Sequence, residues 1–357
     1  MNKMALQDIR STLIKQELDS FIVTSVVNVR YLTGFTGDSS IVIVNPDSAL
    51  FITNSLYYEE ALDTIPDLYE VIDAGAGLFA YLGEQGRELF GKTAGYEPEN
   101  MTCASHMKWK DVLDGVTLKP AYRIVEQLRE IKSSDEIDCI RKAQAITDKT
   151  FNDILDLVRP GVSERDLALE IDYRFRLGGA DKSAFPTIVA AGPHASKPHA
   201  VPSDRKLLSG DCVIFDMGAS WNGYASDMTR TVMLGCPNSR YREVYTAVLD
   251  AQQAGLDTIR AGLTGGEVDA AARSVIESRG YGERFIHSLG HAVGLDIHEF
   301  PSLSRKSETE LKPGMVVTVE PGIYIPGWGG VRIEDMIVVT DNGCDNLTRT
   351  SKTLIEL

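Results

Sequence analysis

Two aspartates lie inside segments that otherwise read as apolar strands, in the stretch "VIFDMGASWNGYASDMTRT" (residues 213–231). At its centre, Asn222-Gly223 is a strong signal for a two-residue type I′ hairpin turn, which needs positive φ at both central positions. In that register Asp216 faces Thr229, so Asp216 and Asp227 are diagonal neighbours on one face of the sheet, roughly 7–8 Å apart. Two carboxylates that close, among apolar residues, repel each other unless they are protonated or neutralised by a cation. Taken alone, the pair has a simpler interpretation, because most aspartates face solvent or cap turns.

Further carboxylates and histidines occur in similar settings. The strand-like run "MVVTVEPG" ends at Glu320, and "VRIEDMIVV" reads as one strand with Glu334 inside it. Five of the six histidines fall between residues 192 and 299: His194, His199, His287, His291 and His298. A lone histidine is more often a structural residue than a ligand, and a direct role for His194 and His287 is left open. Together, four carboxylates and the glycine-flanked His291 of "HSLGHAVGLDIHE" make an oxygen-rich site with one imidazole.

This set of ligand types predicts the metal and the chemistry. Carboxylate-rich coordination suits Mn²⁺ and similar divalent ions, whereas a structural zinc site would normally recruit thiolates. Four carboxylates carry more negative charge than one divalent ion balances, which favours two ions. Ions roughly 3.5–4 Å apart would jointly lower the pKa of a bridging water and generate hydroxide at neutral pH. We therefore expect a hydrolase with two divalent metal ions, Mn²⁺ first, with Co²⁺ and Zn²⁺ as alternatives.

Other catalytic signatures are missing. The sequence contains no HExxH motif, no GxSxG nucleophile elbow, and neither a GxxxxGK[ST] loop nor a GxGxxG fingerprint after a strand. A helix-borne zinc protease, a serine hydrolase and a nucleotide-binding enzyme are therefore not indicated.

Composition limits the partners and the location. A chain of 357 residues with 43% hydrophobic content suits a globular protein of two domains. The net charge of −15 argues against nucleic acid and against an anionic membrane surface, since both are polyanions. Five widely spaced cysteines without a CxxC pair indicate no disulfide framework. We read no signal peptide in the first 21 residues and no apolar run that would span a bilayer, so a cytoplasmic protein is expected.

The elements that must position these residues fall into two parts. Strand-like runs at residues 20–25, 40–45 and 49–54, with a helical pattern at residues 55–65, predict an N-terminal α/β domain over residues 1–123. A long charged helical stretch is expected from about Ile124 past Phe151, and a second helix after Ser163 as N-cap, stopped by Gly178 and Gly179. Strands follow beyond residue 210, with helices near residues 240–259 and 266–280. The second domain is predicted to cover residues 124–357.

The motifs "KPHAVPSD", "DMGASWNGYASDMTRT", "HSLGHAVGLDIHE", "VEPGIYI" and "GGVRIED", in this order, resemble the creatinase/prolidase/aminopeptidase P family. More weakly, "NVRYLTGFTG" resembles the N-terminal domain of bacterial Xaa-Pro peptidases. The resemblance implies an α/β (α+β) protein, in which a creatinase-like N-terminal domain precedes a pita-bread catalytic domain with a curved, mainly antiparallel sheet covered by helices. It also implies a homodimer that hydrolyses the bond before proline in dipeptides or short peptides.

The resemblance further implies a role for each candidate residue. Asp227 and Glu334 would bridge the ions, Asp216 would complete one metal, and His291 with Glu320 would complete the other. Glu320 would also act as general base toward the bridging hydroxide and pass the proton to the leaving nitrogen. The remaining assignments are His298 as stabiliser of the carbonyl oxygen, His199 as contact to the residue after the scissile bond, and Arg332 as partner of the ligand carboxylates or of a substrate carboxylate.

The sequence departs from the family pattern at two places, and three other functions are considered. Ala292 stands where the family usually has glycine, and residues 54–57 (Asn-Ser-Leu-Tyr) differ from the usual aspartate and arginine ahead of the tyrosine. The alternatives are a methionine aminopeptidase-like enzyme, an amidino hydrolase on the same scaffold, and a catalytically silent peptide-binding module. Methionine aminopeptidases usually lack so large an N-terminal domain, and the intact set of five ligands argues against the amidino hydrolase and the silent module.

Overall fold

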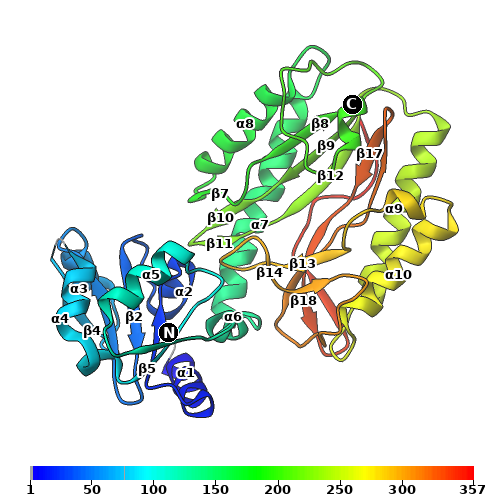
Figure 1. The fold of residues 1–357 in the computed structure, drawn as a ribbon. Coiled ribbons are helices and arrows are strands. Elements are labelled where there is room, and N and C mark those ends of the chain that lie inside the picture. Colours follow the sequence, from blue (N-terminus) through cyan, green and yellow to red (C-terminus); the bar gives the residue numbers. More distant parts are fainter. Residues whose placement is uncertain (1–2, 76) are drawn as a thin grey trace. The chain divides into compact units, whose positions relative to one another are not determined.

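The computed structural model describes residues 3–75 and 77–357, and the chain divides into two compact units, one up to Arg129 and the other from Glu130 to Leu357 (Figure 1). Ile124, the expected start of the catalytic domain, is the first residue of helix α6 (Ile124–Arg129), which directly precedes this division. Within the described ranges, no helix combines the length and the apolar character that crossing a bilayer requires. All five cysteines are free thiols.

The N-terminal unit is built around a six-stranded mixed sheet with the order β4-β3-β2-β1-β5-β6. The pairs β1–β2 and β2–β3 are antiparallel, and the other three pairs are parallel. The three predicted apolar runs form β1, β2 and β3, whose residues are almost all buried, as expected for strands covered on both faces. The strands are β1 (Ser20–Val23), β2 (Ser40–Val44), β3 (Ala49–Thr53), β4 (Glu70–Asp73), β5 (Thr93–Tyr96) and β6 (Thr117–Pro120).

Helices cover both faces of this sheet (Figure 1). Side chains alternate along β1, so Phe21 and Val23 pack into one apolar cluster, with helices α1, α2 and α6, while Ile22 packs into another, with α4 and α5. The helices are α1 (Lys3–Gln16), α2 (Val26–Thr33), α3 (Tyr58–Thr64), α4 (Leu78–Phe90) and α5 (Cys103–Val112), besides α6. The result is the α/β domain that the sequence predicts, with the sheet between two layers of helices.

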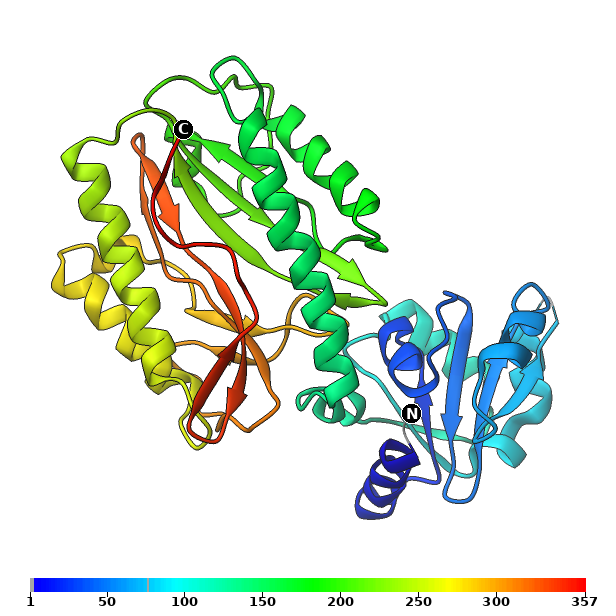
Figure 2. The same cartoon turned by 180° about the vertical axis from the view of Figure 1, so that it is seen from behind.

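The C-terminal unit, all of whose residues the structure describes, contains four α-helices outside a set of mainly antiparallel strands (Figure 2). Helices α7 and α8 share an apolar cluster with β8, β9 and β12, while α9 and α10 share another with β13, β15 and β18. As predicted, Ser163 caps α8 through a capping box, and Gly178 is its C-cap. The helices are α7 (Ser134–Ile154), α8 (Glu164–Leu177), α9 (Ser239–Thr258) and α10 (Gly265–Ser278), with 3₁₀ turns η1 (Leu155–Leu157), η2 (Gly192–Ser196) and η3 (Gly282–Arg284).

Four sheets carry the strands of this unit. A four-stranded sheet has the order β20-β12-β9-β8, a five-stranded sheet β14-β13-β15-β18-β19, a three-stranded sheet β11-β10-β7, and the last pairs β16 with β17. The strands are β7 (Lys182–Ser183), β8 (Ile188–Ala191), β9 (Cys212–Met217), β10 (Ala219–Trp221), β11 (Tyr224–Ala225), β12 (Met228–Met233), β13 (Gly290–Ala292), β14 (Glu299–Leu303), β15 (Val316–Val319), β16 (Gly322–Ile325), β17 (Gly329–Arg332), β18 (Asp335–Thr340), β19 (Gly343–Asn346) and β20 (Ile355–Glu356).

The hairpin predicted at Asn222-Gly223 is confirmed. Both residues have positive φ, 49° and 80°, as a type I′ turn requires. β10 and β11 pair from this turn, and the same register continues into β9 and β12, where Asp216 faces Thr229. The carboxylates of Asp216 and Asp227 therefore start from the same face of the sheet.

Two expectations about continuous elements were wrong. The helical stretch from Ile124 breaks after Arg129, because Ser133 forms a capping box with Glu136 and starts α7 as a new helix. The expected single strand around Glu334 is two strands, β17 and β18, which pair with different neighbours. Glu334 lies in the link between them, where its backbone N–H donates to the Thr229 carbonyl at 3.1 Å.

Candidate metal centre

The five predicted ligands come from separate segments and line one cavity of about 530 Å³ in the C-terminal unit. Asp216 lies on β9, and Asp227 directly precedes β12. The other three are His291 on β13, Glu320 directly after β15, and Glu334 between β17 and β18. Two different sheets thus supply the polar groups of one site.

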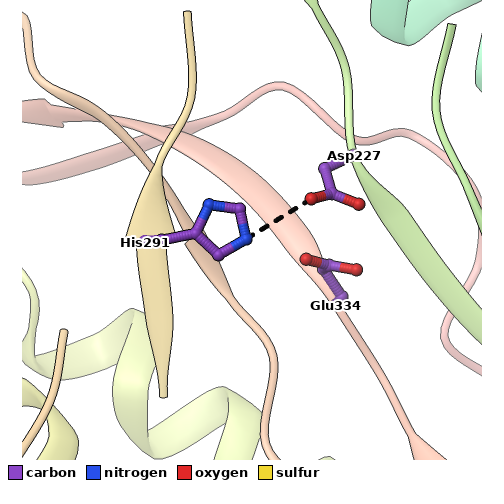
Figure 3. Close-up of side chains that lie close together, drawn as sticks. All are labelled: Asp227, His291 and Glu334. Atoms are coloured by element: carbon purple, nitrogen blue, oxygen red, sulfur yellow. Dashed lines mark ion pairs between the residues drawn. The ribbon is translucent and has the colours of Figure 1, made fainter. Parts of the chain in front are cut away.

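Three of these residues form the tightest group. One ligand atom each of Asp227, His291 and Glu334 lie within 4.8 Å of one another, and Figure 3 shows both carboxylates facing the imidazole ring. The His291 Nε2 atom lies 3.5 Å from Asp227 Oδ2 and 3.4 Å from Glu320 Oε1. These separations leave room for a cation between the nitrogen and the oxygens.

The imidazole of His291, the histidine in this group, is uncharged. Burial, and next the neighbouring His298, lower the pKa of His291 to about 4. Its Nδ1 lies 3.2 Å from the Ala292 carbonyl oxygen, which can only accept, so Nδ1 carries the proton. The lone pair of Nε2 therefore points at carboxylate oxygens, an arrangement that a metal ion would stabilise.

The carboxylates are held where their charged forms are disfavoured. Burial has the largest effect on Glu320 and raises its pKa to about 8, although the positive charge of Arg332 acts in the opposite direction. Burial and then neighbouring carboxylates raise the pKa of Asp227 and Glu334 well above the ordinary range. A divalent cation among them would replace the bound protons and offset the mutual repulsion.

Asp216 offers an unused oxygen. Its Oδ2 accepts from Arg332 Nη2 at 2.6 Å, whereas the buried Oδ1 has no hydrogen-bond partner among the described residues. A buried carboxylate oxygen without a partner is costly, and a metal ion would satisfy it. The orphaned oxygen, the neutral imidazole and the four carboxylates together fit divalent ions that prefer oxygen ligands.

Two threonines orient carboxylate oxygens of the predicted ligands. The Thr229 hydroxyl donates to Glu334 Oε2 at 2.8 Å and accepts from Arg332 Nε at 2.9 Å. The Thr318 hydroxyl donates to Glu320 Oε1 at 3.2 Å and accepts from the His291 backbone N–H at 3.1 Å. Each hydroxyl thus fixes the carboxylate of a predicted ligand by using both its donor and its acceptor.

A hydrogen-bonded chain extends behind Asp216. Besides its contact to Asp216, Arg332 donates from Nη1 to the Tyr324 hydroxyl at 2.7 Å. That hydroxyl lies 2.9 Å from His287 Nε2, and His287 Nδ1 lies 2.8 Å from the Ser288 carbonyl oxygen. Nδ1 therefore carries the ring proton and the tyrosine hydroxyl donates to Nε2. Burial first of all lowers the pKa of His287 to about 4, so this ring is neutral.

The other predicted histidines separate into two kinds. His199 and His298 line the cavity, and the rings of His298 and His291 lie 4.3 Å apart. Burial, followed by the charge of His199, lowers the pKa of His298. His194 is not among the described residues that line this cavity.

His194 belongs instead to an anchor of the segment that carries His199. Glu164, the buried first residue of α8, accepts from the Ala191 backbone N–H at 2.8 Å and from the Ser203 hydroxyl at 2.6 Å. His194 Nδ1 lies 2.9 Å from Glu164 Oε2. The buried carboxylate thus holds both ends of the segment from Ala191 to Ser203.

Sequence reasoning did not find Tyr324, Thr229, Thr318 or Glu164. Tyr324 stands in an apolar strand, where an aromatic residue reads as core. Glu164 follows an N-cap, where an acidic residue is ordinary. Only contacts between distant segments distinguish these four residues.

The rest of the cavity wall is largely apolar. Side chains that could contact a small apolar ring surround the polar cluster: Phe185, Pro186, Ile188, Pro198, Val201 and Ile297. A polar centre with apolar walls is typical of a site for a small ligand.

Comparisons with known proteins identify the family. The sequence model of Metallopeptidase family M24 matches residues 138–341, and that of the Creatinase/Prolidase N-terminal domain matches residues 6–131. The chain is 43% identical to the uncharacterized peptidase YqhT of Bacillus subtilis over 99% of this chain and 100% of that one.

Solved structures are similar along the whole chain. The Xaa-Pro dipeptidase from Bacillus anthracis is 42% identical, with a TM-score of 0.96 over 99% of both chains. The X-Pro aminopeptidase from Thermotoga maritima MSB8 is 33% identical, with a TM-score of 0.90 over 98% of this chain and 100% of the other. The predicted fold and family are thus confirmed: the chain belongs to Metallopeptidase family M24, with an N-terminal domain of the creatinase/prolidase type.

Proposed function

We propose that this protein is a peptidase with two divalent metal ions that hydrolyses the peptide bond before proline in dipeptides or short peptides. The observation that carries the proposal is the cluster of four carboxylates around a neutral imidazole, inside a cavity with apolar walls. The names of the similar proteins, an Xaa-Pro dipeptidase and an X-Pro aminopeptidase, support the same bond specificity.

Five residues would hold the ions: Asp216, Asp227, His291, Glu320 and Glu334. In this proposal Asp227 and Glu334 bridge, and the oxygen-rich set favours Mn²⁺, with Co²⁺ and Zn²⁺ as alternatives. The bound ions would supply Lewis acidity, which lowers the pKa of water and stabilises charge on the scissile carbonyl oxygen.

Glu320 is the general base of the proposal. It lies at the edge of the cluster, with Thr318 orienting Oε1. Its Oε1 lies 3.4 Å from Nε2 of His291 in the cluster that would hold the ions, so this carboxylate would lie within reach of a water bound there. It would take the proton from the attacking water and deliver it to the proline nitrogen as that nitrogen leaves.

Two histidines would contact the substrate. His298 is a neutral ring beside His291, so it can donate a hydrogen bond to the carbonyl oxygen as negative charge develops there. His199, on the segment that Glu164 anchors, would contact the residue after the scissile bond. For Arg332, the contacts to Asp216 and Tyr324 support a positioning role.

The subunit number and the location belong to the same proposal. We expect a homodimer in the cytoplasm, because the family resemblance implies the dimer and five free thiols suit a reducing compartment. Size-exclusion chromatography with light scattering measures the first, and a monomeric mass at micromolar concentration would contradict it.

The test of function uses protein reconstituted with Mn²⁺ and pairs of peptides that differ only in the second residue. We expect Ala-Pro or Ala-Pro-Ala to be cleaved, and Ala-Ala, Ala-Ala-Ala and Met-Ala-Ala to be poor substrates. Glu320→Gln should lower kcat by about 10²–10⁴-fold, the usual contribution of a general base. Equal cleavage of the alanine and proline series, or better cleavage of Met-Ala-Ala, would contradict the proposal.

A further inference from the structure

The cavity offers little to hold the free carboxylate of an Xaa-Pro dipeptide. Among the described residues that line it, Arg332 is the only arginine or lysine, and four of the other lining residues are acidic. The two ions of the proposed function would be offset by those four carboxylates. A substrate carboxylate therefore needs another cation.

Arg332 is already committed to the protein. Its Nη2 donates to Asp216 at 2.6 Å, its Nε to Thr229 at 2.9 Å, and its Nη1 to Tyr324 at 2.7 Å. Nη1 also lies 3.4 Å from the Pro198 carbonyl oxygen, and the side chain is only 4% exposed. Turning this guanidinium toward a substrate would break contacts that hold a ligand carboxylate.

A second cavity, of about 1120 Å³, adjoins the first one. His287 and Ser288 line both cavities, and at the end of β14 the lining passes from Ser302 in the first to Ser304 in the second. The shared residues place the second cavity next to the cluster.

The second cavity has a small excess of cationic side chains, although the whole chain has a net charge of −15. Four cationic and two acidic side chains line it: Arg273, Arg284, Arg305, Lys306, Glu277 and Glu283. Arg273 is buried and pairs with Asp269. Arg284, Arg305 and Lys306 are exposed. Arg305 Nη2 lies 3.5 Å from Glu277 Oε1, and the exposed lining as a whole carries three positive and two negative side chains. We call the surface formed by Arg284, Arg305 and Lys306 the basic groove. Such a groove attracts anions.

We infer that the basic groove receives the C-terminal carboxylate of the substrate, so that the enzyme acts on peptides of three or more residues in which the proline carbonyl is part of an amide bond. This inference rests on the proposed function. When the proline carbonyl is part of an amide bond, no negative charge of the substrate lies in the first cavity. The C-terminal carboxylate then contacts the cations of the basic groove.

The first experiment compares Ala-Pro with Ala-Pro-Ala on Mn²⁺-loaded protein. We expect kcat/KM to be about 10- to 100-fold higher for the tripeptide, the range that one charged hydrogen bond supplies. Equal or better cleavage of the dipeptide would overturn the inference and leave the proposed function intact. Cleavage of neither peptide would refute the proposed function and the inference with it.

The second experiment tests the groove directly with Ala-Pro-Ala-Ala and its C-terminal amide. Removing two exposed cations in Arg305→Ala/Lys306→Ala should lower kcat/KM for the free acid by about two- to tenfold. The amide should be unaffected, and the loss should shrink at high salt.

A matched variant controls for net charge. Arg141→Ala/Lys149→Ala removes two exposed cations of α7 that pair with acids and line neither cavity, and it should leave both substrates unchanged. If the groove variant treats acid and amide alike, or the control reproduces its effect, the basic groove is not the carboxylate site.

Discussion

Without metal, the free energy of unfolding of the C-terminal unit should decrease as the pH rises above neutrality. In the metal-free cluster the pKa of Glu320 is raised from its usual 4.5 to about 8. Between these values the folded protein binds a proton that the unfolded chain has released. The free energy of unfolding falls with rising pH wherever the folded state binds more protons than the unfolded state. Glu320 therefore destabilises the metal-free protein increasingly as the pH rises between these two pKa values.

Two histidines oppose this trend at lower pH. The pKa values of His287 and His291 are lowered from 6.5 to about 4. Between those values the unfolded chain binds more protons than the folded one, so these groups add stability as the pH rises and then become constant. The histidine contributions level off only about one pH unit above 6.5, so the effect of Glu320 is isolated as the difference in pH dependence between the parent protein and a Glu320 variant.

The size of the effect follows from the shift. At about 1.4 kcal/mol per pKa unit, Glu320 alone should lower the unfolding free energy by on the order of 1–2 kcal/mol between pH 6.5 and 8. Asp227 and Glu334, whose pKa values are also raised, should add to the loss. Saturating Mn²⁺ should restore more than about 2.7 kcal/mol at a concentration of 100 Kd.

The assay is chemical denaturation of protein freed of metal with a chelator. Unfolding of the C-terminal unit is monitored by the fluorescence of Trp221 and Trp328, in a variant whose Trp109 in the N-terminal unit has been replaced. Glu320→Gln is the matched variant, since it keeps the shape and removes the titrating proton. The pH dependence of the parent protein should exceed that of the variant. Metal-free protein whose stability rises between pH 6.5 and 8, or a variant with the same slope, would refute the reasoning.

Three further substitutions test single contacts. Asp227→Asn should bind fewer Mn²⁺ ions per chain than the parent by elemental analysis, and full retention would sink its bridging role. Tyr324→Phe removes the hydroxyl that accepts from Arg332, so kcat/KM should fall about tenfold, as for one hydrogen bond to a charged group. Unchanged kinetics would show that the hydrogen bonds from Arg332 through Tyr324 do not contribute to activity. Lys132→Met breaks the buried 3.0 Å pair with Glu299 and should lower the unfolding free energy by about 3–5 kcal/mol. The double variant Lys132→Met/Glu299→Leu should recover most of that loss by denaturation, and a double variant no more stable than the single one would contradict the pairing argument.

Local patterns in the sequence were sufficient for the hairpin and for the faces of its strands. Asn222-Gly223 requires positive φ at both positions, and the period of two then places Asp216 and Asp227 on one face. Helix caps such as Ser163 could be read in the same way, because a cap involves residues only three apart. The S-x-x-E pattern at Ser133 was also readable, although the continuous apolar spacing around it suggested one uninterrupted helix.

Contacts between distant segments were decided only by the tertiary structure. The packing of two sheets brings His291 within 3.5 Å of Asp227, and no local pattern contains that distance. Arg332 illustrates the limit: its spacing from Glu334 placed it near the ligands, yet its partner remained open until β17 was seen to bring the guanidinium to Asp216. Turns and caps depend on neighbouring residues, whereas ion pairs and shared cavities depend on how whole sheets pack. The sequence by itself thus indicated the family, most of the elements and the residue types of the cluster, and the packing of the sheets determined which partners those residues meet.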